Sequence, residues 1–477
     1  MRYDQARWSR EEESVYEPLL IEKDGESVDL GERDIDLPDE LVRDDLTIPT
    51  LSEPEIARHY TRLSQMTYGV DSGPYPLGSC TMKYNPKFTE AVAALDDALV
   101  HPDRPDETVQ GILAIQAKLQ DALAAIGGMD AVTLQPPAGA AGEFAGIRIA
   151  HAYHDYNGDD ERDEIIVPDT AHGTNFASAA LAGYEVIELP SDEDGCMDLD
   201  ALEAATSERT AALMLTNPNT LGVFERDIEQ IAEIVHDAGG LLYYDGANLN
   251  ALLGRARPGD MGFDIMHYNV HKTFATPHGG GGPGAGPVGV TAELARHLPE
   301  PHVRETDDGY ETYVPEQSIG RVHGYAGNWL VLIKAYAYIA RLGDEGLLDT
   351  SAKAVLNANY LGSQIDLDIP YGPYHHEFVA SAGDRDAADV AKLMLDFGVH
   401  PPTTKWPDIV SEALMTEPTE TENRETLDHL AQAFAEVMAA DIEELDKAPR
   451  RTAAKRIDQV AAAREAQLSW HALNDET

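Results

Sequence analysis

Cysteine, basic side chains and long apolar runs are all scarce in this chain of 477 residues. The two cysteines, Cys80 and Cys196, are too few for a disulfide framework. No apolar run reaches the ~18 residues that a membrane-spanning helix needs, so we expect no membrane association. The first residues, MRYDQARWSREEE, lack the apolar core of a signal peptide, and a cytoplasmic location is therefore expected.

Positive charge is also scarce, because 35 Lys and Arg face 85 Asp and Glu, which gives a formal net charge of −50. Nucleic acids and anionic membranes recruit Lys and Arg, so this balance excludes both as partners. The chain is nevertheless 43% hydrophobic, which is too much for a disordered protein. We predict a folded, halophilic protein whose carboxylate-rich surface keeps it hydrated in a salt-accumulating cytoplasm; the alternative is an acidic docking face for one basic partner.

The hydrophobic pattern predicts an α/β fold, and at ~150 residues per domain the length allows about three units. Residues 1–74 are rich in Asp, Glu and Pro and are expected to form an extended arm. From 75 to 330, expected strands at 163–167, 185–189, 211–215 and 241–244 alternate with expected helices such as 143–153 and 228–237. This alternation predicts a mostly parallel sheet covered on both faces, with ligands at the carboxyl ends of its strands.

The chain changes character after an expected long helix at 329–341. A strand at 376–381 and helices at 386–397 and 423–445 predict a smaller α/β domain over 331–446. Residues 447–477 carry Arg and Lys with Ala at helical spacing, which predicts a helical tail packed on this protein or a partner.

The most informative stretch is YYDGAN, in which Asp245 ends an apolar strand, followed 27 residues later by Lys272 in a polar turn. Pyridoxal phosphate needs an amine to form a Schiff base and a carboxylate to keep its ring nitrogen protonated. Lys272 and Asp245 supply this pair. Taken singly, the aspartate could merely cap a helix and the lysine could be solvated, but a lysine between an apolar strand and a Gly-rich loop is unusual in so acidic a chain.

Three more loops offer groups to the same cofactor. Gly139 and Ala140 open a helix whose free N–H groups could hold a phosphate, although small residues also serve tight packing. His172 follows a strand and could stack on the cofactor ring, or be an ordinary loop histidine. Asn219 could donate to the phenolic oxygen, or belong to an Asn-Pro turn. Together, four loops after four strands make a stronger case than any one of them.

The Gly-rich run at 279–286 does not lie between a strand and a helix, as a dinucleotide-binding loop would, and instead suits a loop over Lys272. His and Cys show no metal-ligand spacing, so no metal site is expected. Cys80 is expected to be a buried thiol.

The chain resembles the glycine cleavage system P-protein family, and specifically the second subunit of its split form, which carries the cofactor lysine. The matching motifs run in order from about residue 75 to 425: PLGSCTMKYNPK from Pro76, HGTN from His172, LTNPNTLG from Leu215, YYDGANLNALLG from Tyr243, RPGDMGFD from Arg257, HKTFATPHGGGG from His271, SIGRV from Ser318, AVLNANY from Ala354 and EALMTEPTETE from Glu412. The family usually has His where Ala141 stands and Pro where Phe176 stands, and neither departure touches Lys272, Asp245 or His172.

This resemblance implies a fold type I pyridoxal-phosphate enzyme, with a large mostly parallel-sheet domain and a smaller C-terminal α/β domain. It implies a decarboxylating, aminomethyl-transferring glycine dehydrogenase that passes the aminomethyl group of glycine to the lipoyl arm of the H-protein. The implied assembly is a heterotetramer of two dimers with a homologous first subunit, with sites between subunits. Implied catalytic residues are Lys272, His172 and Asp245, and the expected cofactor-binding residues are Lys272, Asp245, Ala247, His172, Asn219, Gly139, Ala140 and His271. His172, His271 and His278 are unranked candidates for proton transfer.

Two other functions remain open from the residues. Another type I pyridoxal enzyme, such as an aminotransferase, usually binds a substrate carboxylate with an Arg of its small domain, and few arginines occur between 345 and 424. A catalytically silent scaffold subunit would have no reason to keep both Lys272 and Asp245.

Overall fold

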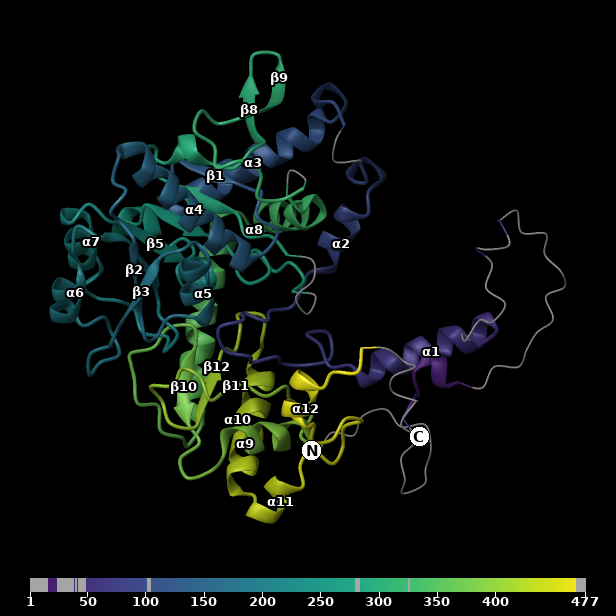
Figure 1. Ribbon diagram of the computed structural model, residues 1–477. Coiled ribbons are helices and arrows are strands. Elements are labelled where there is room, and N and C mark those ends of the chain that lie inside the picture. Colours follow the sequence, from purple (N-terminus) through teal and green to yellow (C-terminus); the bar gives the residue numbers. More distant parts are fainter. Residues whose placement is uncertain are drawn as a thin grey trace.

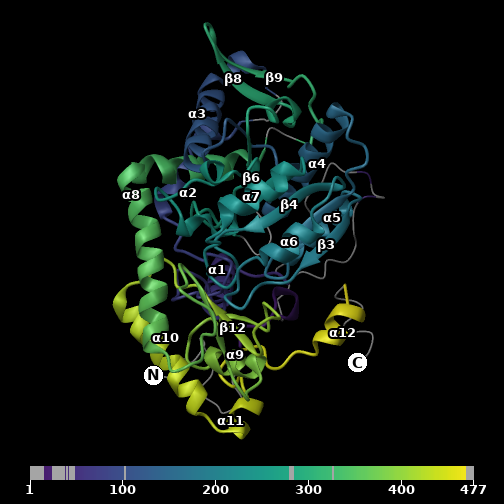
Figure 2. The same cartoon turned by 90° about the vertical axis from the view of Figure 1, so that its left-hand side faces the viewer.

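The computed structural model describes residues 16–23, 38, 41, 49–100, 104–278, 284–324 and 327–468. A large unit built on a seven-stranded sheet adjoins a smaller unit with a three-stranded sheet (Figure 1). The long helix α8 (Trp329–Gln364) runs along the side of both units (Figure 2). The predicted α/β class is confirmed. Most of the Gly-rich run, residues 279–283, lies outside the described residues, so its predicted position over Lys272 stays a prediction.

The central sheet has the strand order β1-β7-β6-β5-β4-β2-β3. Strands β3, β2, β4, β5 and β6 are parallel, whereas β7 is antiparallel to both β6 and β1. The four strands expected from the sequence all form, within one residue at each end. The bounds are β1 (Ala131–Thr133), β2 (Glu164–Pro168), β3 (Glu185–Leu189), β4 (Thr210–Thr216), β5 (Leu241–Asp245), β6 (Ile265–His267) and β7 (Val288–Val290).

Alternate side chains of the central strands enter two separate cores. Leu242 and Tyr244 of β5 belong to one core, with buried residues of α3, α7 and α8. Leu241 and Tyr243 of the same strand belong to the other, with residues of α4 and α5. Because side chains in a strand alternate between faces, a strand apolar at every position must be covered on both sides. The carboxyl ends of β4 and β5 are thereby left as the accessible edge.

The covering helices follow the expected amphipathic pattern. In α7 the buried residues are Ile228, Ile231, Ala232 and Val235, which is one stripe of a helix. Gly239 follows α7 with φ of 80°, and the Gly240 amide bonds to the carbonyl of Val235, so the expected glycine cap is present. The helices of the large unit are α2 (Lys87–Ala93), α3 (Gln110–Gly127), α4 (Gly139–Asn157), α5 (Gly173–Leu181), α6 (Leu199–Ala205) and α7 (Ile228–Asp237). A hairpin of β8 (His302–Thr306) and β9 (Gly309–Tyr313) packs against α3.

The smaller unit has an antiparallel sheet of order β10-β12-β11, comprising β10 (Phe378–Ser381), β11 (Thr403–Thr404) and β12 (Ala413–Thr416). Helices α9 (Ala387–Leu395), α10 (Arg424–Ala439) and α11 (Ile442–Asp446) pack with it around a separate core. The single helix expected over 423–445 is divided in two, because Ala440 has extended φ and ψ and the Asp441 side chain caps a new helix.

Three local expectations need correction. The arm expected to be extended contains helix α1 (Glu53–Met66), where Ser52 and Glu55 form a capping box that the composition argument overlooked. In the described part of the predicted tail, residues 447–468, the helix is much shorter than expected, since α12 covers only Gln459–Arg464 and starts at the Asp458 cap. Helix α8 continues past 341 to Gln364 through a break at Gly343, whose φ is 60°. Among the described residues, no helix is long and apolar enough to cross a membrane.

Candidate active site

Asp245 lies at the carboxyl end of β5, where the sheet leads into a short 3-10 helix (Gly246–Ala251). Its carboxylate accepts the main-chain N–H of Ala247 at 2.9 Å and the side-chain amide of Asn175 at 3.0 Å. The residue is 2% exposed. Ala247 therefore contributes a backbone donor that fixes Asp245, and Asn175, at the start of α5, is a partner that the sequence argument did not select.

The charge of Asp245 is stabilised in spite of burial. Burial disfavours the carboxylate, but His267, whose Nε2 lies 3.3 Å away, and the charge of Lys272 hold the pKa of Asp245 below its ordinary value. An ionised aspartate is the state that a protonated pyridine nitrogen requires beside it.

A second carboxylate, Glu143 in the first turns of α4, shares this environment. Asn175 donates to Glu143 Oε2 at 2.8 Å as well as to Asp245. Burial and the neighbouring Asp245 raise the pKa of Glu143 to about 8, so Glu143 is protonated at neutral pH while Asp245 is charged. The lone carboxylate in the small-residue run QPPAGAAGE was the sequence signal that could have identified it.

Lys272 follows β6 in a turn, and its Nζ donates to the main-chain carbonyl of Ser79 at 2.8 Å. Its charge contributes to lowering the pKa of Asp245 and to opposing the rise in the pKa of Glu143, so the three groups lie within electrostatic range of one another. The structure thus brings Lys272 and Asp245 together, as the sequence predicted.

The start of α4 offers the expected backbone donors. Its N-cap, Ala138, has no side-chain bond to the first turn, and Gly139 and Ala140 are the first helical residues. A Cβ on Gly139 would lie 2.1 Å from Asn269 Oδ1, and one on Gly142 would lie 2.6 Å from the carbonyl of Gly286. This end of α4 is therefore packed so closely that only glycine fits, and its amides stay available for an anion.

His172 caps α5, with Nδ1 accepting the N–H of Thr174 at 3.2 Å. This bond places the ring hydrogen on Nε2. The residue is exposed, and its ring packs edge-on against Trp406 of the smaller unit, with centroids 5.6 Å apart. The predicted stacking of His172 on a cofactor stays a prediction.

Asn219 is placed differently from the expectation. Its Oδ1 accepts the N–H groups of Leu221 and Val223, and its Nδ2 donates to the carbonyl of Gly195 at 2.7 Å. The side-chain oxygen thus closes its own loop, which is the turn role that the sequence left open, and the amide group ties this loop to the turn at Gly195. A contact from Asn219 to a cofactor stays a prediction, and in this geometry it would require a rotated side chain.

His271 and His278 lie together, with ring centroids 5.1 Å apart. Burial and the charge of Lys272 lower the pKa of His271 to about 3 and also lower that of His278. His271 Nδ1 is buried and has no hydrogen-bond partner among the described residues. The neutral form of both imidazoles is thereby favoured at pH 7, and the low pKa of His271 makes it a poor proton acceptor.

Motifs far apart in the sequence meet beside Lys272. The fully buried Lys83 donates to the main-chain carbonyl of Thr273 at 3.1 Å, to Asn250 Oδ1 at 2.7 Å and to Glu420 at 2.5 Å. The motifs that begin at Pro76, His271 and Glu412 therefore lie side by side next to Lys272. Sequence spacing alone could not show this contact.

These residues fit pyridoxal phosphate. The chain provides an amine at Lys272, a buried ionised carboxylate at Asp245, a glycine-lined helix start for the phosphate and an exposed ring at His172. Each group comes from a loop at the carboxyl edge of the sheet, which is where this class of fold binds its ligands.

Comparisons with known proteins agree with this reading. The family model "Glycine dehydrogenase, C-terminal domain" matches residues 350–461, and "Aminotransferase class-V" matches residues 141–282. A solved structure of a glycine decarboxylase P-protein has a TM-score of 0.72 at 23% identity and covers 84% of this chain and 93% of its own. A cysteine desulfurase from Escherichia coli has a TM-score of 0.58 at 17% identity, covering 82% and 99%. These two likenesses establish the fold type I pyridoxal-enzyme fold.

Closer relatives cover nearly the whole chain. A probable glycine dehydrogenase (decarboxylating) subunit 2 from Halobacterium salinarum is 71% identical over 473 residues, which is 99% of each chain. The protein of the same name from Pyrococcus abyssi is 51% identical over 495 aligned positions, covering 98% of this chain and 97% of its own. The chain therefore belongs to the family of glycine dehydrogenase (decarboxylating) subunit 2 proteins, as its motifs predicted.

Proposed function

We propose that this protein is the lysine-bearing subunit of a two-subunit glycine dehydrogenase that decarboxylates glycine and passes the aminomethyl group to the lipoyl arm of an H-protein. The observation that carries the proposal is the meeting of Lys272 with the buried, ionised Asp245 at the carboxyl edge of the sheet. The family membership supplies the substrate, since the relatives are named for glycine decarboxylation.

Different residues of the chain bind different parts of pyridoxal phosphate. Lys272 attaches it covalently, the start of α4 binds its phosphate, Asp245 keeps its ring nitrogen protonated and His172 covers one ring face. Bound there, the cofactor accepts the electrons that carbon dioxide leaves behind. His278, the less buried of the two histidines near Lys272, would accept a proton from the Lys272 amine more readily than His271, whose pKa is about 3.

The partners follow from the same family. A homologous first subunit completes the site in a heterotetramer of two dimers, and lipoylated H-protein takes the product. Both cysteines are free, which is consistent with the cytoplasm, and the charge of −50 together with the 71% identity to a Halobacterium protein supports a halophilic setting.

A single-turnover assay tests the activity. Holoenzyme with its partner subunit is mixed with glycine labelled in its carboxyl carbon, in high KCl. We expect labelled carbon dioxide only when lipoylated H-protein is present, and none from the Lys272→Ala variant. Turnover that needs a keto acid instead of the lipoyl group would identify an aminotransferase, and a native complex without bound pyridoxal phosphate would identify a scaffold.

A further inference from the structure

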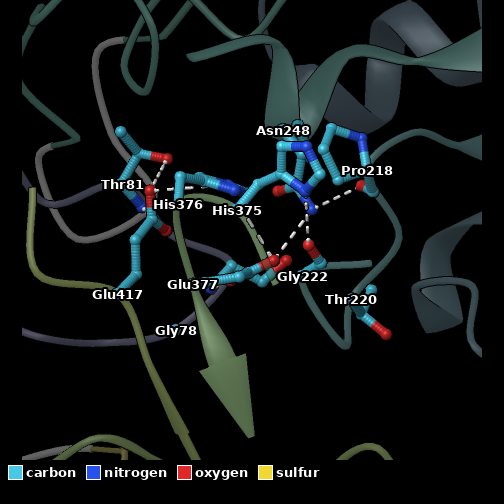
Figure 3. A network of polar contacts seen from close by, with 12 residues as sticks. Gly78, Thr81, Pro218, Thr220, Gly222, Asn248, His375, His376, Glu377 and Glu417 are labelled. Atoms are coloured by element: carbon cyan, nitrogen blue, oxygen red, sulfur yellow. Dashed lines mark hydrogen bonds and ion pairs between the residues drawn. The ribbon is translucent and has the colours of Figure 1, made fainter. Parts of the chain in front are cut away.

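A second cluster of ionisable side chains lies where the smaller unit meets the large one. His376 and Glu377 precede β10, and Glu417 follows β12. One donor atom from each lies within 4.8 Å of the others, and all three residues are buried, none more than 1% exposed. Figure 3 shows these side chains together with Thr81 and Asn248, which contact the two glutamates.

The imidazole of His376 has no hydrogen-bond partner among the residues that the structure describes. Neither Nδ1 nor Nε2 makes a hydrogen bond, although the ring is fully buried. Nε2 points between the carboxylates, 3.9 Å from Glu377 Oε1 and 3.8 Å from Glu417 Oε1. These distances are too long for hydrogen bonds, and an unpaired buried ring nitrogen is costly. The three atoms are therefore arranged around a common point without satisfying one another.

Both carboxylates are held in place by other groups. Glu377 accepts the N–H of Ser79 at 2.6 Å and the amide of Asn248 at 2.8 Å. Glu417 accepts the N–H of Thr81 at 2.8 Å and its hydroxyl at 2.6 Å. Ser79 and Thr81 have φ of 59° and 44°, an uncommon backbone conformation for such residues that directs both amides at the cluster. Hydrogen bonds of this kind are what orient the carboxylates of metal sites.

In the described part of the chain, the cations that act on the two glutamates are Lys83 and Lys272, and both also serve other groups. The nearby Lys83 is paired with Glu420 at 2.5 Å. Lys272 bonds to the Ser79 carbonyl and already faces Asp245. Buried carboxylates are balanced either by protonation or by a nearby positive charge, and a bound cation would supply that charge here.

We propose that His376, Glu377 and Glu417 bind one divalent first-row transition-metal ion, such as Mn²⁺, Fe²⁺ or Zn²⁺. One imidazole nitrogen with two carboxylate oxygens suits these ions better than Mg²⁺ or Ca²⁺, which take oxygen ligands. Metal–ligand bonds of ~2.1 Å allow one ion to span donor atoms separated by the observed 3.8 and 3.9 Å.

The ion has a positioning role in this geometry. It would fasten the strands of the smaller unit to the 79–81 loop, whose Ser79 carbonyl receives the Lys272 amine. The expectation of no metal site rested on short-range spacing, and that argument cannot detect Glu417, which lies 40 residues beyond Glu377. The proposal stands independently of the proposed function.

Mn²⁺ binding to the full-length protein tests the site directly. The protein, with its partner subunit, is stripped with a chelator and titrated with MnCl₂ in high KCl, which suppresses binding to surface carboxylates. Electron paramagnetic resonance measures free Mn²⁺, and electron spin echo modulation detects a coordinated ¹⁴N. We expect one ion per chain with histidine-nitrogen coupling, and displacement by Zn²⁺.

Variants assign the ligands. Glu417→Gln and His376→Gln should each weaken Mn²⁺ binding at least tenfold, and His376→Gln should abolish the nitrogen signal. Thr81→Val, which removes only a bond that orients Glu417, should weaken binding by roughly 10–100-fold. Glu225→Gln is the matched control, because Glu225 is a buried glutamate bonded to Met197 and Asn219 outside the cluster, and binding should be unchanged.

The proposal fails if the native protein binds no Mn²⁺ above the surface background, or binds it without nitrogen coupling, because the cluster is then balanced by protons. The proposal also fails if the folded Glu417→Gln variant binds Mn²⁺ as tightly as the native protein does. Should the ligand variants not fold, the stoichiometry and nitrogen coupling of the native protein decide the question.

Discussion

The ammonium group of Lys272 is hydrogen-bonded to the main-chain carbonyl of Ser79, at 2.8 Å and across 193 residues of sequence. The amine is thus held by a loop whose own conformation is unusual, since Ser79 has φ of 59°. An amine fixed at the site before it reacts loses less freedom on attachment to the cofactor.

Replacing Lys272 with alanine should remove covalent cofactor binding while leaving the fold intact. We expect the visible absorption band of the bound cofactor to disappear, because no other amine is presented beside Asp245 in the described part of the chain. The fully buried Lys83 is already engaged by Asn250, Thr273 and Glu420. Absorbance spectra of purified protein with added pyridoxal phosphate measure the change.

Lys87→Ala is the matched control for Lys272→Ala, because Lys87 is an exposed lysine paired with Asp71 on the surface. Its spectrum should equal that of the native protein. Cofactor that stays covalently attached to Lys272→Ala after borohydride reduction, denaturation and removal of free cofactor would show that another lysine forms the bond.

Stability should fall as pH rises because of Glu143. The pKa of Glu143 is raised from 4.5 to about 8 in the folded protein, mainly by burial. Between these values the unfolded chain has released the proton and the folded chain still holds it, so the free energy of unfolding decreases as pH rises from ~4.5 to ~8. Glu143→Gln removes this contribution and should stabilise the protein more at pH 8 than at pH 5.

Thermal melts of both proteins across pH 5 to ~9 provide the measurement. Glu225, whose pKa burial raises to about 7, acts in the same direction, so the native slope should diminish in Glu143→Gln but persist in part. Glu229→Gln, at an exposed position of α7, is the control and should leave the slope unchanged. Equal slopes in Glu143→Gln and the native protein would contradict a protonated Glu143.

The sequence predicted the position of a residue well where that position depends on a single strand or helix. Asp245 and His172 sit at strand-to-helix junctions, and such junctions are visible as an apolar run followed by polar or small residues. Strand β3 and helix α7 have the predicted bounds because their periodicity is strong and their ends are marked by turn residues. The break at Ala440 was missed because the apolar spacing continues across it.

Contacts between residues far apart in the sequence could not be predicted from local sequence patterns. Asn175 joins Glu143 to Asp245 from three different elements, and no local pattern encodes that bridge. The side chain of Asn219 is used by the backbone: its oxygen accepts the N–H groups of Leu221 and Val223, and its amide donates to the carbonyl of Gly195 in another loop. Long-range packing therefore decides which polar groups face the ligand and which satisfy the backbone.

The close packing at Gly142 predicts a steric effect on cofactor binding. Alanine is favoured over glycine in helices by about 1 kcal/mol, so propensity alone predicts that Gly142→Ala is stabilising. Its Cβ would lie 2.6 Å from the Gly286 carbonyl oxygen, and overpacking of that kind costs roughly 1–3 kcal/mol. We expect a lower melting temperature and weaker pyridoxal phosphate binding, measured by calorimetry and absorbance titration.

Gly111→Ala separates this steric effect from helix propensity. Gly111 lies in the first turn of α3 with no atom within 4 Å of an added Cβ, so the variant should be as stable as the native protein or more so. If Gly142→Ala bound pyridoxal phosphate as tightly as the native protein does, the start of α4 would not be the phosphate site.

Salt should stabilise the protein, because like-charge repulsion among surface carboxylates is the dominant long-range interaction at a net charge of −50. The Debye length shrinks from ~10 Å at 0.1 M to ~3 Å at 1 M, which screens this repulsion. Screening also weakens exposed ion pairs such as those of Arg209 with Asp163 and Glu185, but the 85 acidic residues outnumber the 35 basic ones. The melting temperature should therefore rise with KCl.

Sorbitol at equal osmolality is the control for excluded-solute effects. Replacing Glu229 and Glu233, two exposed residues of α7, with glutamine should reduce the dependence of the melting temperature on KCl. A melting temperature independent of KCl would mean that the acidic surface is organised for a basic partner instead of for salt.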